Sequence, residues 1–297
     1  MNFINVFVEG EYSIKVKNSS LVLEGKESHS YPLSDVGVVM LESLKSNISV
    51  YALNALVEAG ATVFVCNDRH LPTAVLTASN DYYKPLHRYK LQTEVSKPRL
   101  KRLWREIIRS KISNQAECLS RAVGNVGKLI ELCDAVKSGD SDNLEAQAAA
   151  YYFPKLFGRG FIRDSVDGVN AALNYAYSIV RGILCRQICA RGFLPCLGIF
   201  HKNEYNGFNL ADDLIEPFRP IVDYFVYTIK DELVYGLTPL VKRKLFSIVN
   251  LEVESGNERH SLAYAAEREV ESVIAYYDGR DELLFPKLIG TAQHCYE

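Results

Sequence analysis

The segment Phe208–Pro220 (FNLADDLIEPFRP) holds the densest group of side chains that could do chemistry. Asp212, Asp213 and Glu216 lie close together, and positions 213 and 216 share one face of a helix. Carboxylates this close repel each other unless a divalent ion or an arginine neutralises them. Two prolines should kink or divide the helix just after Glu216. The pattern predicts a metal-binding cleft, with a solvated acidic helix face as the alternative.

Two further residues could complete a ligand set. Glu145 stands in the first turn of an alanine- and aromatic-rich helix beginning LEAQAAAYYF, and His201 ends the apolar stretch PCLGIFH. Taken singly, such a glutamate is usually a surface residue favoured by the helix dipole, and such a histidine is more often structural. Together, one histidine and two or three carboxylates suit Mn²⁺ well and Mg²⁺ acceptably.

Other kinds of catalytic site find little support. The sequence has no glycine-rich dinucleotide loop, Walker loop or nucleophile elbow, and no Ser or Cys pairs with an obvious His and acid. The cysteines are odd in number and scattered, which indicates reduced packing thiols rather than disulfides. Cys185, Cys189 and Cys196 would permit a soft-metal site, but without the spacing of a zinc knuckle.

Positive charge is concentrated between Lys84 and Lys111. This stretch holds ten Lys and Arg against two Glu, a local balance of +8, while the whole chain has a net charge of −2. A phosphate backbone responds to such local fields. The residues expected to bind DNA are Lys101, Arg102, Arg105 and Arg109. A solvated helix face is the alternative.

The first 75 residues are predicted to form a small β-sheet domain with one helix. The runs that favour strands are Phe3–Val8, Ser13–Val16, Leu21–Leu23, Val36–Leu41 and Ala61–Cys66. Tyr51–Ala59 has helical spacing, and Gly60 is placed to cap that helix. No chemical constellation occurs there, so a dimer interface is a reasonable role.

Residues 76–297 are predicted to form a larger, all-α catalytic domain. Apolar residues recur at helical spacing at Leu100, Leu103, Trp104, Ile107 and Ile108. The clearest helix runs from about Gly168 to Arg191, with Ser165 or Asp167 as N-cap candidate and Gly192 as its stop. The predicted fold class is therefore two-domain α+β, with the metal site and the basic surface on the helical domain.

Composition agrees with an ordinary folded protein. The chain has 297 residues, 48% of them hydrophobic and 24% charged, and its length favours two domains. Its start lacks a basic segment followed by an apolar core, and no apolar run reaches the roughly eighteen residues of a membrane span. We expect a cytoplasmic protein with no membrane association.

The three ligand-bearing segments resemble the Cas1 family, the CRISPR-associated integrases that insert new spacers. In that family a Glu opens a helix of the form E-A-x-A-A-x-Y-F, a His ends P-x-L-G-x-x-H, and an acidic residue lies in D-L-x-E-P-F-R-P. The corresponding residues here are Glu145, His201 and Glu216. Asp164–Tyr177 and Leu33–Glu42 are also similar to family segments, so the resemblance covers most of the chain. The sequence of the acidic motif around Glu216 is most similar to that of Cas1 proteins from type II systems.

The resemblance implies a homodimerising β-domain over residues 1–75 and a metal-binding helical domain over residues 76–297. It implies Glu145, His201 and Glu216 as catalytic metal ligands for Mn²⁺ or Mg²⁺, with Asp213, or alternatively Asp212, in support. The implied partners are double-stranded DNA, as prespacer and repeat array, and the small Cas2 protein. The expected reaction is transesterification, in which a DNA 3′-hydroxyl attacks a phosphodiester without a protein nucleophile.

Two other functions would use the same residues. A structure-specific metal nuclease acting on branched DNA would need the same ligands and the same basic surface. A non-catalytic DNA-binding scaffold would carry the acidic cluster as a solvated helix face. The sequence alone does not separate these alternatives.

Overall fold

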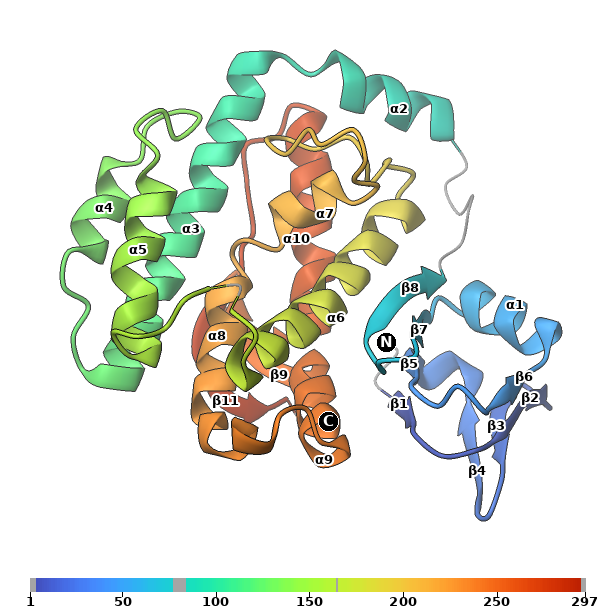
Figure 1. The fold of residues 1–297 in the computed structure, drawn as a ribbon. Coiled ribbons are helices and arrows are strands. Elements are labelled where there is room, and N and C mark those ends of the chain that lie inside the picture. The colour runs from blue at the N-terminus through green and yellow to red at the C-terminus, as the bar shows by residue number, and fades with distance from the viewer. Residues whose placement is uncertain (1–3, 77–83, 164, 295–297) are drawn as a thin grey trace. The chain divides into compact units, whose positions relative to one another are not determined.

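The computed structural model describes residues 4–76, 84–163 and 165–294, which Figure 1 traces from blue to red. These residues divide into two compact units. One is built mainly from the described residues up to 76, and the other from residues 84–188 and 192–294. The order of the elements, strands first and helices after, follows the change of pattern in the sequence.

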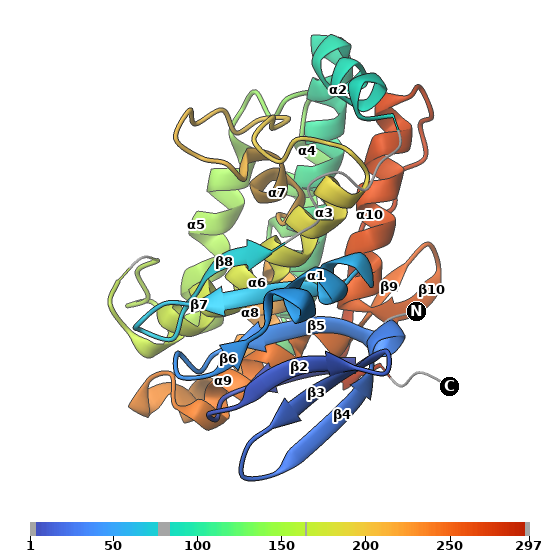
Figure 2. The same ribbon diagram turned by 90° about the vertical axis from the view of Figure 1, so that its right-hand side faces the viewer.

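Within its described residues, the N-terminal unit holds two four-stranded sheets and helix α1 (Val50–Glu58), visible in Figure 2. One sheet has the order β1 (Ile4–Val8), β5 (Val36–Leu41), β7 (Thr62–Cys66), β8 (Pro72–Leu76). The other has the order β4 (Ser28–Pro32), β3 (Ser20–Glu24), β2 (Ser13–Lys17), β6 (Asn47–Ile48). A 3-10 turn, η1 (Leu33–Asp35), precedes β5. In the first sheet β1, β5 and β7 are parallel, and β8 runs antiparallel to β7.

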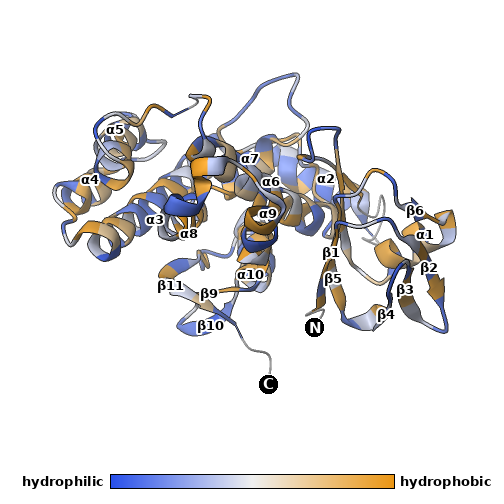
Figure 3. Cartoon of the chain, turned by 60° about the horizontal axis from the view of Figure 1, so that its bottom comes forward, coloured by the Kyte–Doolittle hydropathy of each residue, from blue (hydrophilic) through white to orange (hydrophobic). Residues whose placement is uncertain are grey.

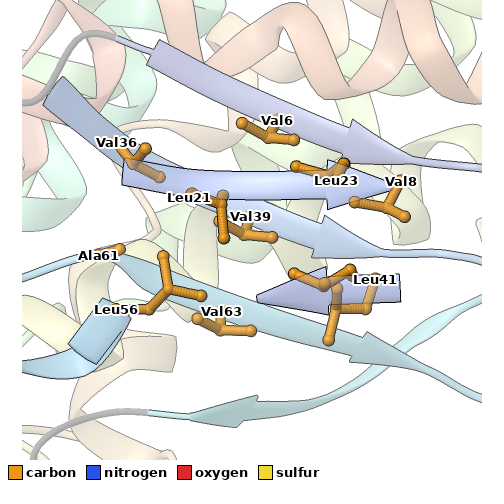
Figure 4. Packing of buried hydrophobic residues seen from close by; sticks show 11 residues of the cluster. Val6, Val8, Leu21, Leu23, Val36, Val39, Leu41, Leu56, Ala61 and Val63 are labelled. Carbon is orange, nitrogen blue, oxygen red and sulfur yellow. The ribbon is translucent and has the colours of Figure 1, made fainter. Parts of the chain in front are cut away.

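The hydrophobic pattern of the strands explains this core. Strand β3 alternates, so that Leu21 and Leu23 point inward, whereas the central strand β5 (VGVVML) is apolar almost throughout. Leu56 of α1 packs into the same cluster, which Figure 4 shows with side chains from both sheets. One continuous core therefore holds the N-terminal unit together.

The strands and the helix expected in this unit are confirmed, and three short strands were not predicted. Gly60 follows α1 with a positive φ of 81°, so its role as a helix stop is also confirmed. Strands β4 and β8 lie at sheet edges, and β6 has only two residues. Strand β4 (SHSYP) is polar and pairs only with β3, so its own residues gave no strand signal.

Helices dominate the second unit. They are α2 (Pro85–Glu94), α3 (Lys97–Val123), α4 (Leu129–Ala135), α5 (Leu144–Phe157), α6 (Gly168–Ala190), α7 (Asn209–Leu214), α8 (Arg219–Thr228), α9 (Pro239–Phe246) and α10 (Leu262–Tyr277), with 3-10 helices η2 (Lys230–Tyr235) and η3 (Ser247–Asn250). Across the described ranges, no helix is long and apolar enough to cross a membrane.

Helix α3 connects the parts of this unit that bear the site. It packs against α4, α5 and α8, and hydrophobic and hydrophilic residues alternate along it in Figure 3. From α3, Asn114 Nδ2 donates to the carbonyl oxygens of Pro217 (2.8 Å) and Pro286 (2.9 Å). Its Oδ1 accepts from the Leu288 N–H at 3.1 Å. One buried amide therefore fixes the chain after α7 to α3.

Both ends of α6 and the break after α7 follow local sequence rules. Asp167 Oδ1 accepts from the Asn170 N–H at 2.7 Å, so Asp167, rather than Ser165, is the N-cap. Gly192 has a positive φ of 75° just beyond the helix. The predicted division of the acidic helix is present but begins earlier than expected, because α7 ends at Leu214 and Glu216 lies in the turn before α8 begins at Arg219.

The prediction that residues 76–297 are all-α is wrong. A three-stranded antiparallel sheet has the order β10 (Glu258–Ser261), β9 (Leu251–Ser255), β11 (Lys287–Gln293). Gly256 and Asn257 join β9 to β10 with φ values of 63° and 65°, as a tight hairpin turn of two left-handed residues requires. The alternation of LEVES before this Gly-Asn pair was the missed signal. Residues 290–293 belong to β11.

Candidate active site

Asp213 is a buried carboxylate whose oxygens are all used by protein donors. Its Oδ2 accepts the backbone N–H groups of Ile199 (2.5 Å) and Phe200 (3.0 Å). Its Oδ1 accepts the His201 N–H at 3.1 Å and lies 2.7 Å from His201 Nδ1. The carboxylate thus fixes both the loop that carries His201 and the ring itself.

The loop before His201 is held closely from several sides. Gln92 bonds the backbone of Leu194 and Leu197, and Asn209 donates to the Cys196 carbonyl oxygen before His201 and to the Asn203 carbonyl oxygen after it. Gly198 lies where the loop passes Asp213, and a Cβ there would lie 2.3 Å from the His201 carbonyl oxygen. This position therefore requires glycine for close approach rather than for an unusual φ.

The contact with Asp213 sets the chemistry of His201. The hydrogen bond to Asp213 is the largest cause that raises the pKa of His201, against partial burial, and Glu216 raises it further. Burial raises the pKa of Asp213, while His201 and the surrounding N–H groups oppose that shift. With Nδ1 directed at the carboxylate, Nε2 is the nitrogen a neutral ring would offer to a metal. The ring also lines a hollow of about 440 Å³, which makes it accessible.

Glu145 and Glu216 meet at a single buried ammonium group. Lys111 Nζ, from α3, lies 2.5 Å from Glu145 Oε1 and 2.5 Å from Glu216 Oε2. The side chains of Lys111 and Glu216 are 10% and 5% exposed, so the pair is shielded from water, whereas that of Glu145 is 28% exposed. The arrangement is a cation position between two carboxylates supplied by different helical segments.

Arg219 neutralises the other oxygen of Glu216. Its Nε donates to Glu216 Oε1 at 2.9 Å. Burial alone would raise the pKa of Glu216, but Arg219 and Lys111 together lower it to about 2. Glu216 is therefore ionised at neutral pH despite its burial.

Behind Arg219 lies a buried polar network from three helices. The guanidinium lies 4.7 Å from the ring centre of Tyr177. The hydroxyl groups of Tyr177 and Tyr152 both donate to Asp223, the latter at 3.0 Å. Burial raises the pKa of Asp223 to about 6, although both hydroxyls and Arg219 lower it. The network fixes the start of α8 and hence the orientation of Arg219.

The structure brings the predicted ligands into two neighbouring groups rather than one closed cluster. Glu145 and Glu216 share Lys111, and His201 is held by Asp213, one turn before Glu216. Among the described residues, no three His, Cys, Asp or Glu side chains already form a metal cluster. The site nevertheless fits a cation, because Lys111 Nζ stands in for one between the carboxylates of Glu145 and Glu216.

Asp213 and Asp212, the two candidates for the supporting carboxylate, have different surroundings. The Asp213 carboxylate bonds His201 and the backbone of the loop before it. These contacts orient the imidazole ring, which is the role of a carboxylate that accepts a hydrogen bond from a metal-binding histidine. Asp212 turns elsewhere: its Oδ2 accepts from Asn206 Nδ2 at 2.7 Å, and its Oδ1 lies 3.7 Å from Arg181 Nη1. The ligand roles themselves stay predictions.

The expected DNA-binding residues lie on α3 with different exposures. Lys101 and Arg102 are exposed, while Arg105 and Arg109 are half-buried, the former bonded to Glu106 at 2.7 Å. Arg109 lies 3.8 Å from Asp134. Arg102 and Arg105 line a solvent-accessible hollow of about 650 Å³ together with Arg99, Glu106 and Asp281, so its three arginines outnumber its two carboxylates by one.

Sequence reasoning missed the two basic residues of the site itself. Lys111 was counted with the basic surface, although it follows Trp104 and Ile107 at seven and four residues, on the buried face of α3. A lysine in phase with an apolar stripe was the available signal. Arg219 was quoted only as part of a motif, and its spacing of three from Glu216 was a signal for an ion pair.

Comparison with known proteins gives consistent matches. Residues 6–234 match the family model described as CRISPR associated protein Cas1. The chain is 36% identical over 294 residues to the CRISPR-associated endonuclease Cas1 of Neisseria meningitidis serogroup C, covering 97% of this chain and 96% of that protein.

Two solved structures have a similar fold. A casposase bound to integration product aligns with a TM-score of 0.74 at 17% identity, covering 95% of this chain and 92% of that one. A partial Cas6-RT-Cas1–Cas2 complex contains a chain that aligns with a TM-score of 0.59 at 17% identity, covering 93% and 96%. At such identities these likenesses establish the fold alone.

The close packing at Gly198 yields a stability prediction. In Gly198→Ala the new Cβ would lie 2.3 Å from the His201 carbonyl oxygen and 2.8 Å from Asp213 Oδ2, so the loop must shift. We expect the free energy of unfolding to fall by about 1–3 kcal/mol, measured by urea denaturation. Gly207→Ala is the matched control, since a Cβ there meets nothing within 4 Å. Equal stability of the two variants would show that the loop is not tightly packed.

Proposed function

This chain belongs to the CRISPR-associated Cas1 family, and we propose on that premise that it is a metal-dependent DNA integrase and endonuclease of CRISPR adaptation. It would join the 3′-hydroxyl ends of prespacer DNA to the repeat array by transesterification, in a type II system. The observation that carries the proposal is the cation position between Glu145 and Glu216, one turn from the His201–Asp213 pair.

The residues of the site would divide the work as follows. Glu145 and Glu216 would hold the cation through their carboxylates, and His201 through Nε2. Asp213 keeps the imidazole ring oriented, and Arg219 keeps Glu216 ionised and in place. A bound Mn²⁺ or Mg²⁺ supplies polarisation of the phosphoryl oxygen and stabilisation of the departing oxyanion.

The helical part, proposed as the catalytic domain over residues 76–297, would also bind the DNA. Arg102 and Arg105 line a solvent-accessible hollow on α3, the helix that provides Lys111 to the site. Lys101 and Arg109 extend the same basic stretch. Such residues bind the phosphate backbone without reading its sequence.

The ligand assignment predicts the effect of three single substitutions. We expect three variants to fold but to lose strand joining: Glu145→Ala, His201→Ala and Glu216→Ala. Removal of a residue that only orients a metal ligand lowers activity roughly 10–100-fold, and the loss of joining activity in these variants should be larger. Each should also lose the rise in melting temperature that Mn²⁺ gives the wild type. Glu131→Ala is the matched control, because Glu131 is an exposed glutamate in the first turn of α4.

The assay supplies a 3′-hydroxylated duplex with a supercoiled plasmid that carries a repeat. An integrase yields joined products, whereas a nuclease of branched DNA only cuts, so the wild type separates those two functions. Wild-type joining by one of the three variants would remove that residue from the site. A wild type that Mn²⁺ does not stabilise would argue against a metal site altogether.

The basic surface predicts a change in salt dependence. Arg102→Glu with Arg105→Glu should weaken DNA binding and reduce the slope of log affinity against log salt by about 2, since each lost phosphate contact removes roughly 0.9. Metal affinity should not change. Lys26→Glu with Lys45→Glu, two exposed lysines of the N-terminal unit, gives the same charge change as a control. An unchanged slope in the arginine variant would identify these residues as merely solvated.

We further propose that the β-sheet domain of residues 1–75 forms a homodimer and that activity on DNA requires a small partner of the Cas2 kind. Inserting a spacer takes two strand transfers at separate positions, and one metal site per chain performs one at a time. A two-fold dimer is the commonest way to duplicate a site. Val50 and Tyr51 of α1 are 82% and 68% exposed, an apolar pair suited to an interface.

Light scattering at micromolar concentration tests the dimer. We expect a mass of twice 33.4 kDa for the isolated chain, and two-ended integration only after the partner is added. A monomeric mass together with two-ended integration by the isolated chain would contradict both parts of this proposal.

A further inference from the structure

Lys111 is an unusual lysine because its charged end is buried. It occupies the apolar face of α3, in phase with Trp104, Ile107 and Ile108, which are at most 2% exposed. Burying an ammonium group is unfavourable unless ionised partners surround it. Lys111 has two such partners, at 2.5 Å each, and both are the carboxylates assigned above to the metal.

Glu216 divides its two oxygens between two cations. Arg219 Nε holds Oε1 at 2.9 Å, and Lys111 Nζ lies 2.5 Å from Oε2. The oxygen that could bind a metal together with Glu145 is therefore the one Lys111 already contacts. With Lys111 and Arg219 present, the two glutamates are fully neutralised, so an added divalent ion would leave an excess of positive charge.

We propose that Lys111 is an internal cation of the metal-free site, holding Glu145 and Glu216 at the positions for metal binding, and that a divalent ion must displace its ammonium group to bind. This inference rests on the proposed metal site. Lys111 is then a positioning residue that competes with the metal. It affects the affinity for the divalent ion and the stability of the protein rather than the chemical step.

The charge balance makes this competition selective. A divalent ion that replaces the ammonium group adds one unit of charge between the two carboxylates. Na⁺ or K⁺ has the same charge as the ammonium group and gains nothing by the exchange, while Lys111 is held locally by its own helix. The device would keep the site in a defined geometry and closed to abundant monovalent ions until Mn²⁺ or Mg²⁺ binds.

The test compares Lys111→Met with the wild type, in chelator and in Mn²⁺. Methionine keeps most of the buried volume and removes the charge. We expect the variant to melt at a lower temperature in chelator, because two close carboxylates lose their shared cation. We expect its Mn²⁺-induced rise in melting temperature to exceed that of the wild type, and calorimetry to show at least about fivefold tighter Mn²⁺ binding, the low end of usual coupling between sites.

Lys137→Met is the matched control, since Lys137 forms an exposed ion pair with Asp142, in which the distance from Nζ to Oδ2 is 2.7 Å. Its response to Mn²⁺ should equal that of the wild type. Lys111→Gln, which keeps a hydrogen-bond donor but no charge, provides the same comparison if the methionine variant does not fold. For both Lys111 variants, the measurements are the affinity for Mn²⁺ and the melting temperature.

The outcomes separate the two proposals. A wild type stabilised by Mn²⁺ and a Lys111 variant stabilised more would support the competition. A Lys111 variant that binds Mn²⁺ equally or more weakly would overturn the role of Lys111 and leave the metal site standing. No Mn²⁺ response in either protein would overturn the metal site, and with it the competition.

Discussion

The structure of the site depends on the close approach of two carboxylates inside a folded protein. Glu145 lies in the first turn of α5 and Glu216 follows α7, yet both come within 2.5 Å of one ammonium group from α3. Such an approach is strongly repulsive without a cation. The helices that carry these residues must therefore be held in place by other contacts, and Asn114 of α3, bonded to the carbonyl oxygen of Pro217, is one of them.

The second half of the site is positioned by backbone geometry. Pro217 ends the acidic helix early, so Asp213 lies in its last turn and turns toward the loop that carries His201. Gly198 lets that loop pass close enough for three N–H groups to reach the carboxylate. Because Asp213 and Glu216 are one turn apart, the histidine half and the glutamate half of the site cannot move independently.

Much of this architecture was predictable from sequence, and the failures have physical causes. The long apolar stripes of α3 and α6 and the core strands of the first unit gave clear signals, as did Pro217 and Pro220 for the break between α7 and α8. Polar edge strands such as β4 are held by pairing with a neighbour, which local pattern does not reveal. The alternation of β9 before its Gly-Asn turn was, by contrast, a local signal that was overlooked. Lys111 was misplaced because a charge count ignores helical phase. The true contacts of Asp213 depend on a loop fold that no spacing rule encodes.

Helix α3 carries residues of both the proposed metal site and the proposed DNA-binding surface, the two sites that an integrase requires. One face directs Lys111 between Glu145 and Glu216, the carboxylates proposed to bind the metal, and another directs Arg102 and Arg105 into a solvent-accessible hollow. A helix is stiff over its length, so a phosphate backbone bound by these arginines, as proposed, would have a defined position relative to the carboxylates. Positioning of this kind is where a reaction without a protein nucleophile gains its rate. The same rigidity means that Lys111 can leave its carboxylates only by movement of its own side chain, since α3 is fixed by Asn114 and by its packing against α5 and α8.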